Sequence, residues 1–157
     1  MQATAIIPAR SGSKRIPHKN IKNFSGHPII SYAISTALES NLFEHVVVST
    51  DCKEISVISE SYGAQVPSLR PQNLSDDYTP TVPVIQYVIN ELNQSGIHSD
   101  HYCCIYPCTP FISKNDLTNC LEILIQKNAN FCYPVTRYPH PIERAIEIDD
   151  NNKPTFI

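Results

Sequence analysis

Residues 3–22 read ATAIIPARSGSKRIPHKNIK, an apolar run followed directly by a polar, basic loop. The apolar part, residues 3–8, predicts a buried strand because it is short and carries no charged side chain. Similar runs at residues 46–50 and 101–106 predict two more buried strands, with helical apolar spacing between the three. Strands that alternate with helices indicate βαβ units. We therefore expect an α/β fold, a three-layer sandwich whose mostly parallel sheet has helices on both faces.

Other segments fit the same alternation. Helices are predicted at residues 29–38, from the N-cap Asp51 to Gly63, from Pro80 or Pro83 to Gly96, and from the cap Asn115–Asp116 through Ile125. A short strand is predicted at 64–69 and another at 131–135. Residues 144–149 and 153–157 are predicted to pair as a hairpin around an Asn-rich turn.

Composition indicates a single domain, residues 1–157. The chain has 157 residues, of which 41% are hydrophobic and 17% charged, which suits one buried core and not a disordered chain. No apolar run approaches the ~20 residues of a membrane span, and residues 1–9 lack the basic region of a signal peptide. The six cysteines form no CxxC pair and the six histidines no zinc-like pair. We therefore expect buried free thiols, no metal cluster and a reducing, cytoplasmic location.

Positive charge is concentrated near the N-terminus. The net charge of −3 argues against a nucleic-acid surface. Residues 1–38 nevertheless contain no Asp or Glu, while residues 10–22 carry Arg10, Lys14, Arg15, Lys19 and Lys22. Such a cluster is either a solvated loop or an anion site. The loop follows the first predicted strand, and ligands of parallel sheets bind beyond the carboxyl ends of the strands, so we favour the anion site.

The loop contains the groups that bind a polyphosphate, although it fits neither the Walker A nor the G-x-G-x-x-G pattern. A glycine permits close approach of the backbone, and serine N–H groups and hydroxyls can donate to phosphate oxygens. Cationic side chains supply the charge. These groups come from Arg10, Ser11, Gly12, Ser13, Lys14 and Lys19.

Residues 6–21, IIPARSGSKRIPHKNI, closely resemble the first motif of the CMP-sugar acid synthetases, the cytidylyltransferases that activate nonulosonic acids. Further matches follow in order: VSTD at 48–51, RPQNLSDD at 70–77 and YPCTP at 106–110. Sialic acid members usually carry Gln-Pro-Thr-Ser-Pro at the last of these motifs. With YPCTP there and YPHPIERA at 138–145, the chain looks most like the pseudaminate branch. The resemblance implies a Rossmann-like nucleotidyltransferase fold of the GT-A-like kind.

The resemblance also implies a reaction. CMP would pass from CTP to the anomeric hydroxyl of a nine-carbon sugar acid, and pyrophosphate would leave. Arg10 and Lys19 would be catalytic, because they hold the phosphates and stabilise the departing pyrophosphate. The sugar would be bound by Tyr106 and Arg144. The expected nucleotide-binding residues are Arg10, Ser11, Gly12, Ser13, Lys14, Lys19, Asn20, Arg70, Asp77 and Thr79.

Simpler structural roles remain open for several of these residues. Asn20 could cap a turn, and Arg70 could be a surface charge. Tyr106 could pack in the core, and Arg144 could lie on a strand face. Helix capping is the competing role for four more residues, Asp76, Asp77, Thr79 and Thr81, and Asp51 fits an N-cap better than a metal ligand.

Metal binding and dimerisation are expected from the resemblance alone. Mg²⁺ should accompany CTP, but the family's Mg²⁺-binding Asp pair has no match here, since Asp149 and Asp150 precede a turn. Lys153 to Ile157 reads like the start of a strand. We therefore expect a C-terminally truncated chain whose metal ligands lie beyond Ile157. Residues 138–157 would begin a dimerisation and sugar-binding arm, and the full-length protein would be a homodimer.

Other functions remain open. A sialic or legionaminic acid cytidylyltransferase would use the same motifs. A catalytically incomplete nucleotide-binding fragment would bind CTP without turnover. A nucleotidyltransferase that uses another nucleoside triphosphate is disfavoured, because those enzymes usually have a more glycine-rich first loop.

Overall fold

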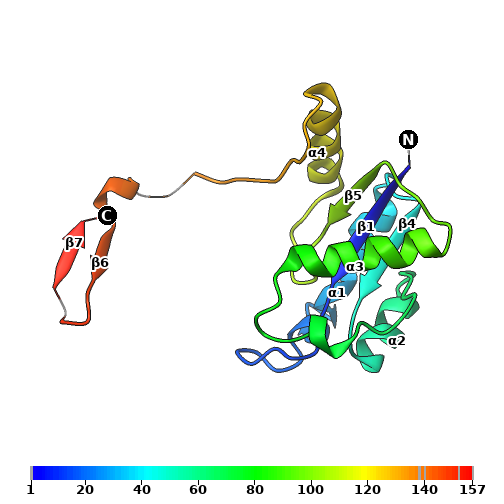
Figure 1. The fold of residues 1–157 in the computed structure, drawn as a ribbon, viewed down its shortest axis with the longest axis horizontal. Coiled ribbons are helices and arrows are strands. Elements are labelled where there is room, and N and C mark those ends of the chain that lie inside the picture. The colour runs from blue at the N-terminus through cyan, green and yellow to red at the C-terminus, as the bar shows by residue number, and fades with distance from the viewer. Residues whose placement is uncertain (1, 138, 140, 152, 157) are drawn as a thin grey trace.

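The computed structural model describes residues 2–137, 139, 141–151 and 153–156. At its centre is a parallel sheet of three strands in the order β4-β1-β5, shown in Figure 1. These strands are β1 (Ala3–Pro8), β4 (His45–Ser49) and β5 (His101–Cys104). Ile6 of β1 lies opposite Val47 of β4 and Cys104 of β5. The predicted parallel sheet is therefore confirmed, with β1 in the middle.

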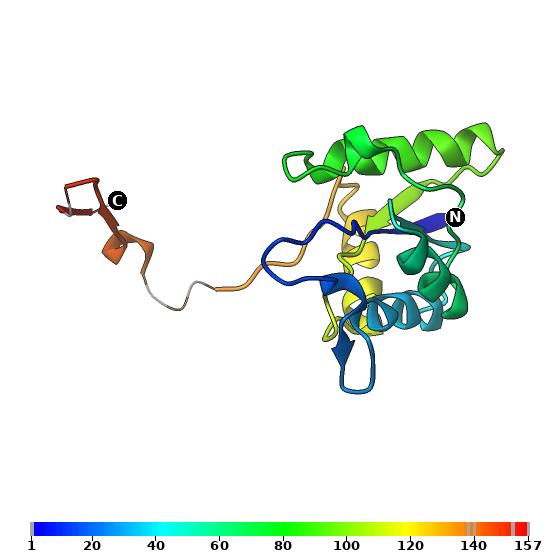
Figure 2. The same ribbon diagram turned by 90° about the horizontal axis from the view of Figure 1, so that it is seen from below.

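Helices cover both faces of this sheet, as predicted (Figure 2). One face packs against α1 (Ile29–Glu39), α2 (Lys53–Ser61) and α4 (Lys114–Gln126), and the other against α3 (Thr81–Gln94). Side chains alternate along a strand, so neighbouring residues serve opposite cores. Ile7 packs with Ile34 of α1, whereas Ile6 packs with Leu92 of α3.

Residues 64–70 run beside β4. The predicted strand at 64–69 forms only two isolated parallel bridges, Val47 with Gln65 and Thr50 with Leu69. The N–H of Arg70 donates to the carbonyl of Thr50 at 2.8 Å. This segment therefore brings Arg70 to the carboxyl end of β4.

Short elements connect the main ones. The basic loop ends in a 3₁₀ turn, η1 (Lys19–Ile21), and a hairpin of β2 (Asn23–Phe24) and β3 (His27–Pro28) follows. Ser25 and Gly26 at its tip have φ of 49° and 96°, which a tight hairpin turn requires and glycine adopts readily. A second 3₁₀ turn, η2 (Gln72–Leu74), follows Arg70.

Two helix starts differ from the prediction. The N-cap of α4 is Ser113, whose side chain accepts from the N–H of Asp116 in a reciprocal capping box. Asp116 is thus the third helical residue and not the cap. The N-cap of α2 is Cys52, so the predicted capping role of Asp51 is wrong.

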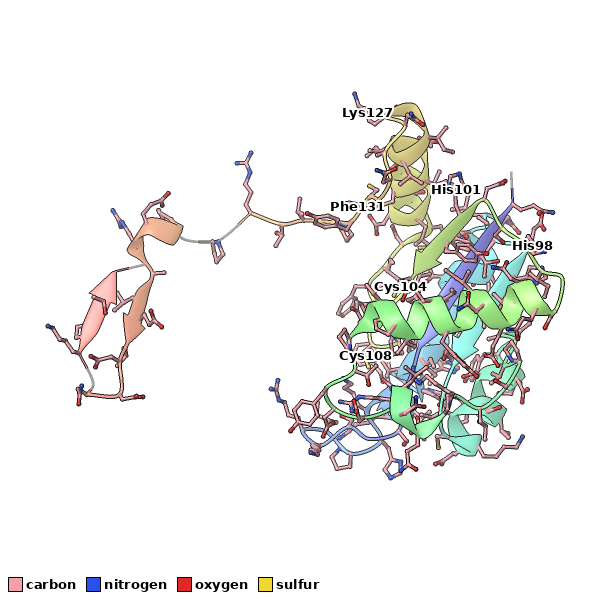
Figure 3. All side chains as sticks on the ribbon, in the orientation of Figure 1. His98, His101, Cys104, Cys108, Lys127 and Phe131 are labelled. Atoms are coloured by element: carbon pink, nitrogen blue, oxygen red, sulfur yellow. The ribbon has the colours of Figure 1, made fainter. Side chains whose placement is uncertain are left out.

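The C-terminal segment leaves the body of the molecule. Residues 131–135 form no strand, contrary to prediction, and Phe131, Tyr133 and Val135 are exposed. Pro134 has no N–H to donate to a sheet ladder, and the segment leads away from α4 (Figures 1 and 3). Beyond it come η3 (Ile142–Arg144) and the predicted hairpin of β6 (Ile146–Ile148) with β7 (Pro154–Phe156).

The cysteines are free thiols, as predicted. They are less buried than predicted: Cys104 is exposed, and the other five are half-buried.

Candidate functional site

A cavity of about 490 Å³ lies at the carboxyl end of β1. It is formed between the basic loop and the loop that follows η2. Its lining consists of Arg10, Ser11, Gly12, Ser13, Lys14, Pro17, His18, Ser75, Asp76, Asp77 and Tyr78. The position is the one at which parallel sheets bind ligands, and it brings together two segments separated by about sixty residues of sequence.

Asp77 connects the two sides of this cavity. Nη1 of Arg10 donates to Oδ1 of Asp77 at 2.6 Å and to the carbonyl of Asp76 at 2.9 Å. Nζ of Lys14 pairs with Oδ2 of the same carboxylate. Lys14 and then Arg10 hold the pKa of Asp77 below its usual value. Two cationic groups of the loop therefore already bind one anion, supplied by the chain itself.

Asp51 binds the basic loop through Ser11. Its Oδ1 accepts the N–H of Ser11 at 2.8 Å, and its Oδ2 accepts the Ser11 hydroxyl at 2.7 Å. Sequence reasoning missed this role because a residue before a helix resembles an N-cap. The available signal was that Asp51 follows a strand predicted to end at the same sheet edge as the loop.

Asn20 is buried, and both ends of its side-chain amide are occupied. Nδ2 donates to the carbonyl of Arg10 at 2.8 Å, and Oδ1 accepts from the Cys108 thiol at 3.3 Å. Cys108 lies on the loop after β5 (Figure 3). Burial raises the pKa of the Cys108 thiol, while the positive charge of Lys19 opposes the shift. Asn20 thus connects the basic loop to the YPCTP loop.

Arg70 is 5% exposed, so the alternative of a surface charge is wrong. Its Nε donates to the hydroxyl of Ser75 at 3.0 Å. Burial lowers the pKa of Arg70, the carboxylate of Asp51 raises it, and the charge of Arg10 lowers it again. A buried cation beside a second arginine is a favourable environment for an anionic ligand.

Asp76 and Thr79 belong to a turn that precedes α3. Oδ1 of Asp76 accepts the Thr79 hydroxyl at 2.7 Å, and the N–H groups of Tyr78 and Thr79 at 2.9 and 2.6 Å. These bonds, those from Thr79 first, lower the pKa of Asp76. The predicted capping of a helix by Asp76 or Asp77 is wrong, since α3 begins at Thr81 after Pro80.

The two predicted sugar-binding residues are far apart. The hydroxyl of Tyr106, which is 56% exposed, lies 2.9 Å from the hydroxyl of Thr81 at the start of α3. The core-packing alternative for Tyr106 does not fit this exposure. Arg144 lies in η3, on the segment that extends away from the sheet, so the structure does not bring it to the cavity (Figure 1).

The described residues contain no ready-made cluster of metal ligands. Across residues 2–137, 139, 141–151 and 153–156, no three His, Cys, Asp or Glu side chains gather as metal ligands would. Asp51 and Asp77 both accept hydrogen bonds from donors of the chain.

In the same described ranges, no helix is both long and apolar enough to cross a membrane.

Comparison with known proteins places the chain in a family. The cytidylyltransferase family model matches residues 4–153, and the chain belongs to that family. It is 43% identical to a pseudaminic acid cytidylyltransferase of Campylobacter jejuni over 153 residues, which are 98% of this chain and 66% of that protein. A CMP-N,N'-diacetyllegionaminic acid synthase of Legionella pneumophila is 36% identical over 78% of this chain and 53% of its own length.

A solved structure confirms the fold class. The structure of CMP:2-keto-3-deoxy-manno-octonic acid synthetase complexed with CTP superposes with a TM-score of 0.69 at 22% identity, covering 82% of this chain and 49% of that one. The α/β nucleotidyltransferase fold predicted from the motifs is therefore confirmed. The chain spans just under two thirds of the curated relatives that it matches along nearly its whole length.

Proposed function

We propose that the protein transfers CMP from CTP to the anomeric hydroxyl of a nonulosonic acid, pseudaminate, and releases pyrophosphate. The observation that carries this proposal is the cavity at the end of β1, where Arg10 and Lys14 converge on a carboxylate. A group of cations that binds one anion can bind the phosphates of a nucleotide instead. Membership of the cytidylyltransferase family supports CTP, and the Campylobacter jejuni relative supports pseudaminate.

The basic loop would bind the phosphates. The incoming triphosphate takes the place of Asp77 on Arg10 and Lys14, and the hydroxyl of Ser13 and the open backbone at Gly12 complete the cradle. The anomeric hydroxyl then attacks the α-phosphorus in line. Arg10 and Lys19 stabilise the negative charge that develops on the leaving pyrophosphate. Catalysis is therefore mainly positioning and electrostatic stabilisation.

The cytidine and the sugar would lie on either side of this cradle. Arg70 binds the cytidine, and Asn20 acts there by fixing the backbone of Arg10. Tyr106 contacts the sugar acid, with its hydroxyl oriented by Thr81. Thr79 contributes by shaping the turn that carries Asp77.

Residues 138–157 would form the start of an arm for dimerisation and sugar binding. The extended position of η3 and of the β6–β7 hairpin supports this proposal. In a homodimer, Arg144 on this arm would bind the carboxylate of the sugar acid in the site that the arm completes. The exposed Phe131, Tyr133 and Val135 on the connecting segment suit a surface that a second copy covers.

Two further features belong to the proposal. Mg²⁺ would arrive with CTP. Its further protein ligands would lie outside residues 1–157, because no three metal-ligating side chains gather within the described residues. The free thiols support a reducing, cytoplasmic compartment.

Release of pyrophosphate tests the function. The full-length protein should release pyrophosphate only when CTP, pseudaminate and Mg²⁺ are all present, and ATP, GTP and UTP should not replace CTP. Parallel assays with legionaminate and sialate would identify the sugar. A preference for legionaminate would indicate the activity named for the Legionella pneumophila relative, a CMP-N,N'-diacetyllegionaminic acid synthase. Binding of CTP without turnover on any sugar would leave a nucleotide-binding protein, and no binding of CTP would refute the proposal.

A further inference from the structure

Asp51 lies behind the basic loop and outside the lining of the cavity. It follows β4 just as the loop follows β1, and the two strands are paired, with Pro8 opposite Ser49. The N–H of Ala9 donates to the carbonyl of Ser49 at 2.8 Å, which extends the pairing toward the loop. The sheet therefore delivers Asp51 to Ser11 in a fixed geometry.

Two hydrogen bonds join Asp51 to Ser11, and together they form what we call the clamp. Both oxygens of the Asp51 carboxylate accept a bond from Ser11, one from the backbone and one from the side chain. The loop also bonds to itself, since the N–H of Ser13 donates to the carbonyl of Ser11 at 2.8 Å. Two charge-assisted bonds to one residue fix both its backbone direction and its rotamer. The path of residues 12–14 is then set by Ser11.

Alternative uses of the Asp51 carboxylate do not fit the contacts. Cys52 is the N-cap of α2, and the N–H of Cys52 donates to the hydroxyl of Thr50 at 3.1 Å. Within the described residues, Asp51 belongs to no cluster of metal-ligating side chains. A negative charge close to an anion site is unfavourable unless it is compensated. The buried Arg70 provides that compensation: burial lowers the pKa of Arg70, and the nearby carboxylate of Asp51 opposes this shift.

We propose that Asp51 is the positioning residue of the phosphate-binding loop, holding Ser11 so that the backbone of residues 12–14 and the ammonium group of Lys14 face the triphosphate before it binds. This inference rests on the proposed function. It gives Ser11, which was expected to bind phosphate, the role of an anchor of the loop. The clamp matters most when the triphosphate displaces Asp77, because the loop then loses the contacts of Arg10 and Lys14 with that carboxylate. A loop that is already ordered spares the nucleotide the entropy cost of ordering it.

The test compares Asp51→Asn with Asp51→Ala in the full-length protein. Asparagine can still accept the Ser11 N–H and can donate to the Ser11 hydroxyl, whereas alanine removes both bonds. Both variants remove the charge beside Arg70, so the difference between them isolates the clamp. Affinities for CTP and CMP, measured by calorimetry, separate the phosphates bound by the loop from the rest of the nucleotide.

We expect Asp51→Ala to bind CTP roughly tenfold or more weakly than Asp51→Asn, with the two affinities for CMP nearly equal. KM for CTP should rise by the same factor, while kcat changes less. Ser11→Ala keeps one of the two bonds and should fall between them. Asp100→Ala is the matched control: Asp100 accepts the N–H of Gln2 at 2.9 Å at the opposite edge of the sheet, and CTP affinity should not change.

Three results would overturn the inference: equal CTP affinities of the asparagine and alanine variants, equal losses for CTP and CMP, or a loss in Asp100→Ala as large as that in Asp51→Ala. If Asp51→Ala does not fold, Ser11→Ala against the wild type decides by the same comparison of CTP with CMP. Failure of the proposed function is recognised separately, because the wild type itself would then release no pyrophosphate or would not bind CTP.

Discussion

Oδ1 of Asp77 lies 2.6 Å from Nη1 of Arg10, so a carboxylate occupies the cations of the basic loop before any nucleotide is present. Asp77→Asn removes the negative charge and leaves the shape of the side chain. We expect this variant to bind inorganic pyrophosphate a few-fold more tightly than the wild type, because the anion no longer competes with an internal one. Calorimetric titration with pyrophosphate measures the change.

Glu39→Gln serves as the control for that variant. Glu39, at the end of α1, pairs with Lys114 of α4 at 3.5 Å, and neither residue lines the cavity. Its pyrophosphate affinity should equal that of the wild type. Weaker binding by Asp77→Asn would contradict the competition and would indicate that Asp77 itself contacts the ligand.

Tyr106→Phe removes only the hydroxyl that meets Thr81. Because Tyr106 is proposed to contact the sugar, KM for the sugar acid should rise about fivefold, the cost of one lost hydrogen bond, while KM for CTP stays unchanged. Steady-state assays of the full-length protein with each substrate varied in turn measure both values. Thr81→Val should reproduce part of the effect; a rise in KM for CTP alone would place Tyr106 with the nucleotide.

Leu92→Ala tests the core between the sheet and α3. Leu92 is 1% exposed and packs with Ile6 and Val47. Loss of its side chain should lower the free energy of unfolding by about 2–5 kcal/mol, because a cavity remains where the methyl groups were. Urea denaturation followed by circular dichroism gives the value. Ile125→Ala, at a side chain that is 48% exposed, should cost much less; similar losses would mean that α3 is not packed as described.

Asp116 makes the stability of α4 depend on pH. Bonds from Ser113 lower the pKa of Asp116 below its usual 3.8. A carboxyl group whose pKa is lowered on folding stabilises the protein above its ordinary pKa, and the effect is lost as the pH falls through the lowered value. Asp116→Ala should therefore be less stable than the wild type at pH 7, and the gap should narrow toward pH 3.

Urea midpoints at a series of pH values measure that gap. Asn115→Ala, the neighbouring position, should be close to neutral at every pH, whereas Ser113→Ala should cost about 1 kcal/mol at pH 7. A gap for Asp116→Ala that stays constant with pH would contradict the assignment of the stabilisation to the ionised carboxylate.

The sheet and its helices could be predicted because each depends on local pattern. The β-branched run at 46–48 and the helical spacing from Ile29 onward are decided by burial on one or two faces. The predicted strand at 131–135 failed for the opposite reason. Its residues favour extended structure, but a strand also requires a neighbour with which to pair, and no neighbouring strand lies beside this segment in the described residues.

The individual residues of the site could be predicted from the sequence, but the contacts between them could not. Arg10, Lys14 and Asp77 were all expected from motifs, but their ion pairs join positions far apart in the chain. The same holds for Asp51: the sequence places it before a helix, and only the pairing of β1 with β4 brings it to Ser11. Contacts of this kind depend on strand order, which single-residue propensities do not encode.

The bond from the Cys108 thiol to Asn20 has a consequence for how this sequence can vary. Position 108 has to provide a hydrogen-bond donor, since Nδ2 of Asn20 is directed to the carbonyl of Arg10 and its oxygen would otherwise lose a partner. Cysteine, serine and threonine satisfy that need with small side chains. Valine or alanine there would require a compensating change at position 20. Divergence in this family should therefore keep the two positions paired, so that the basic loop and the YPCTP loop evolve as one unit.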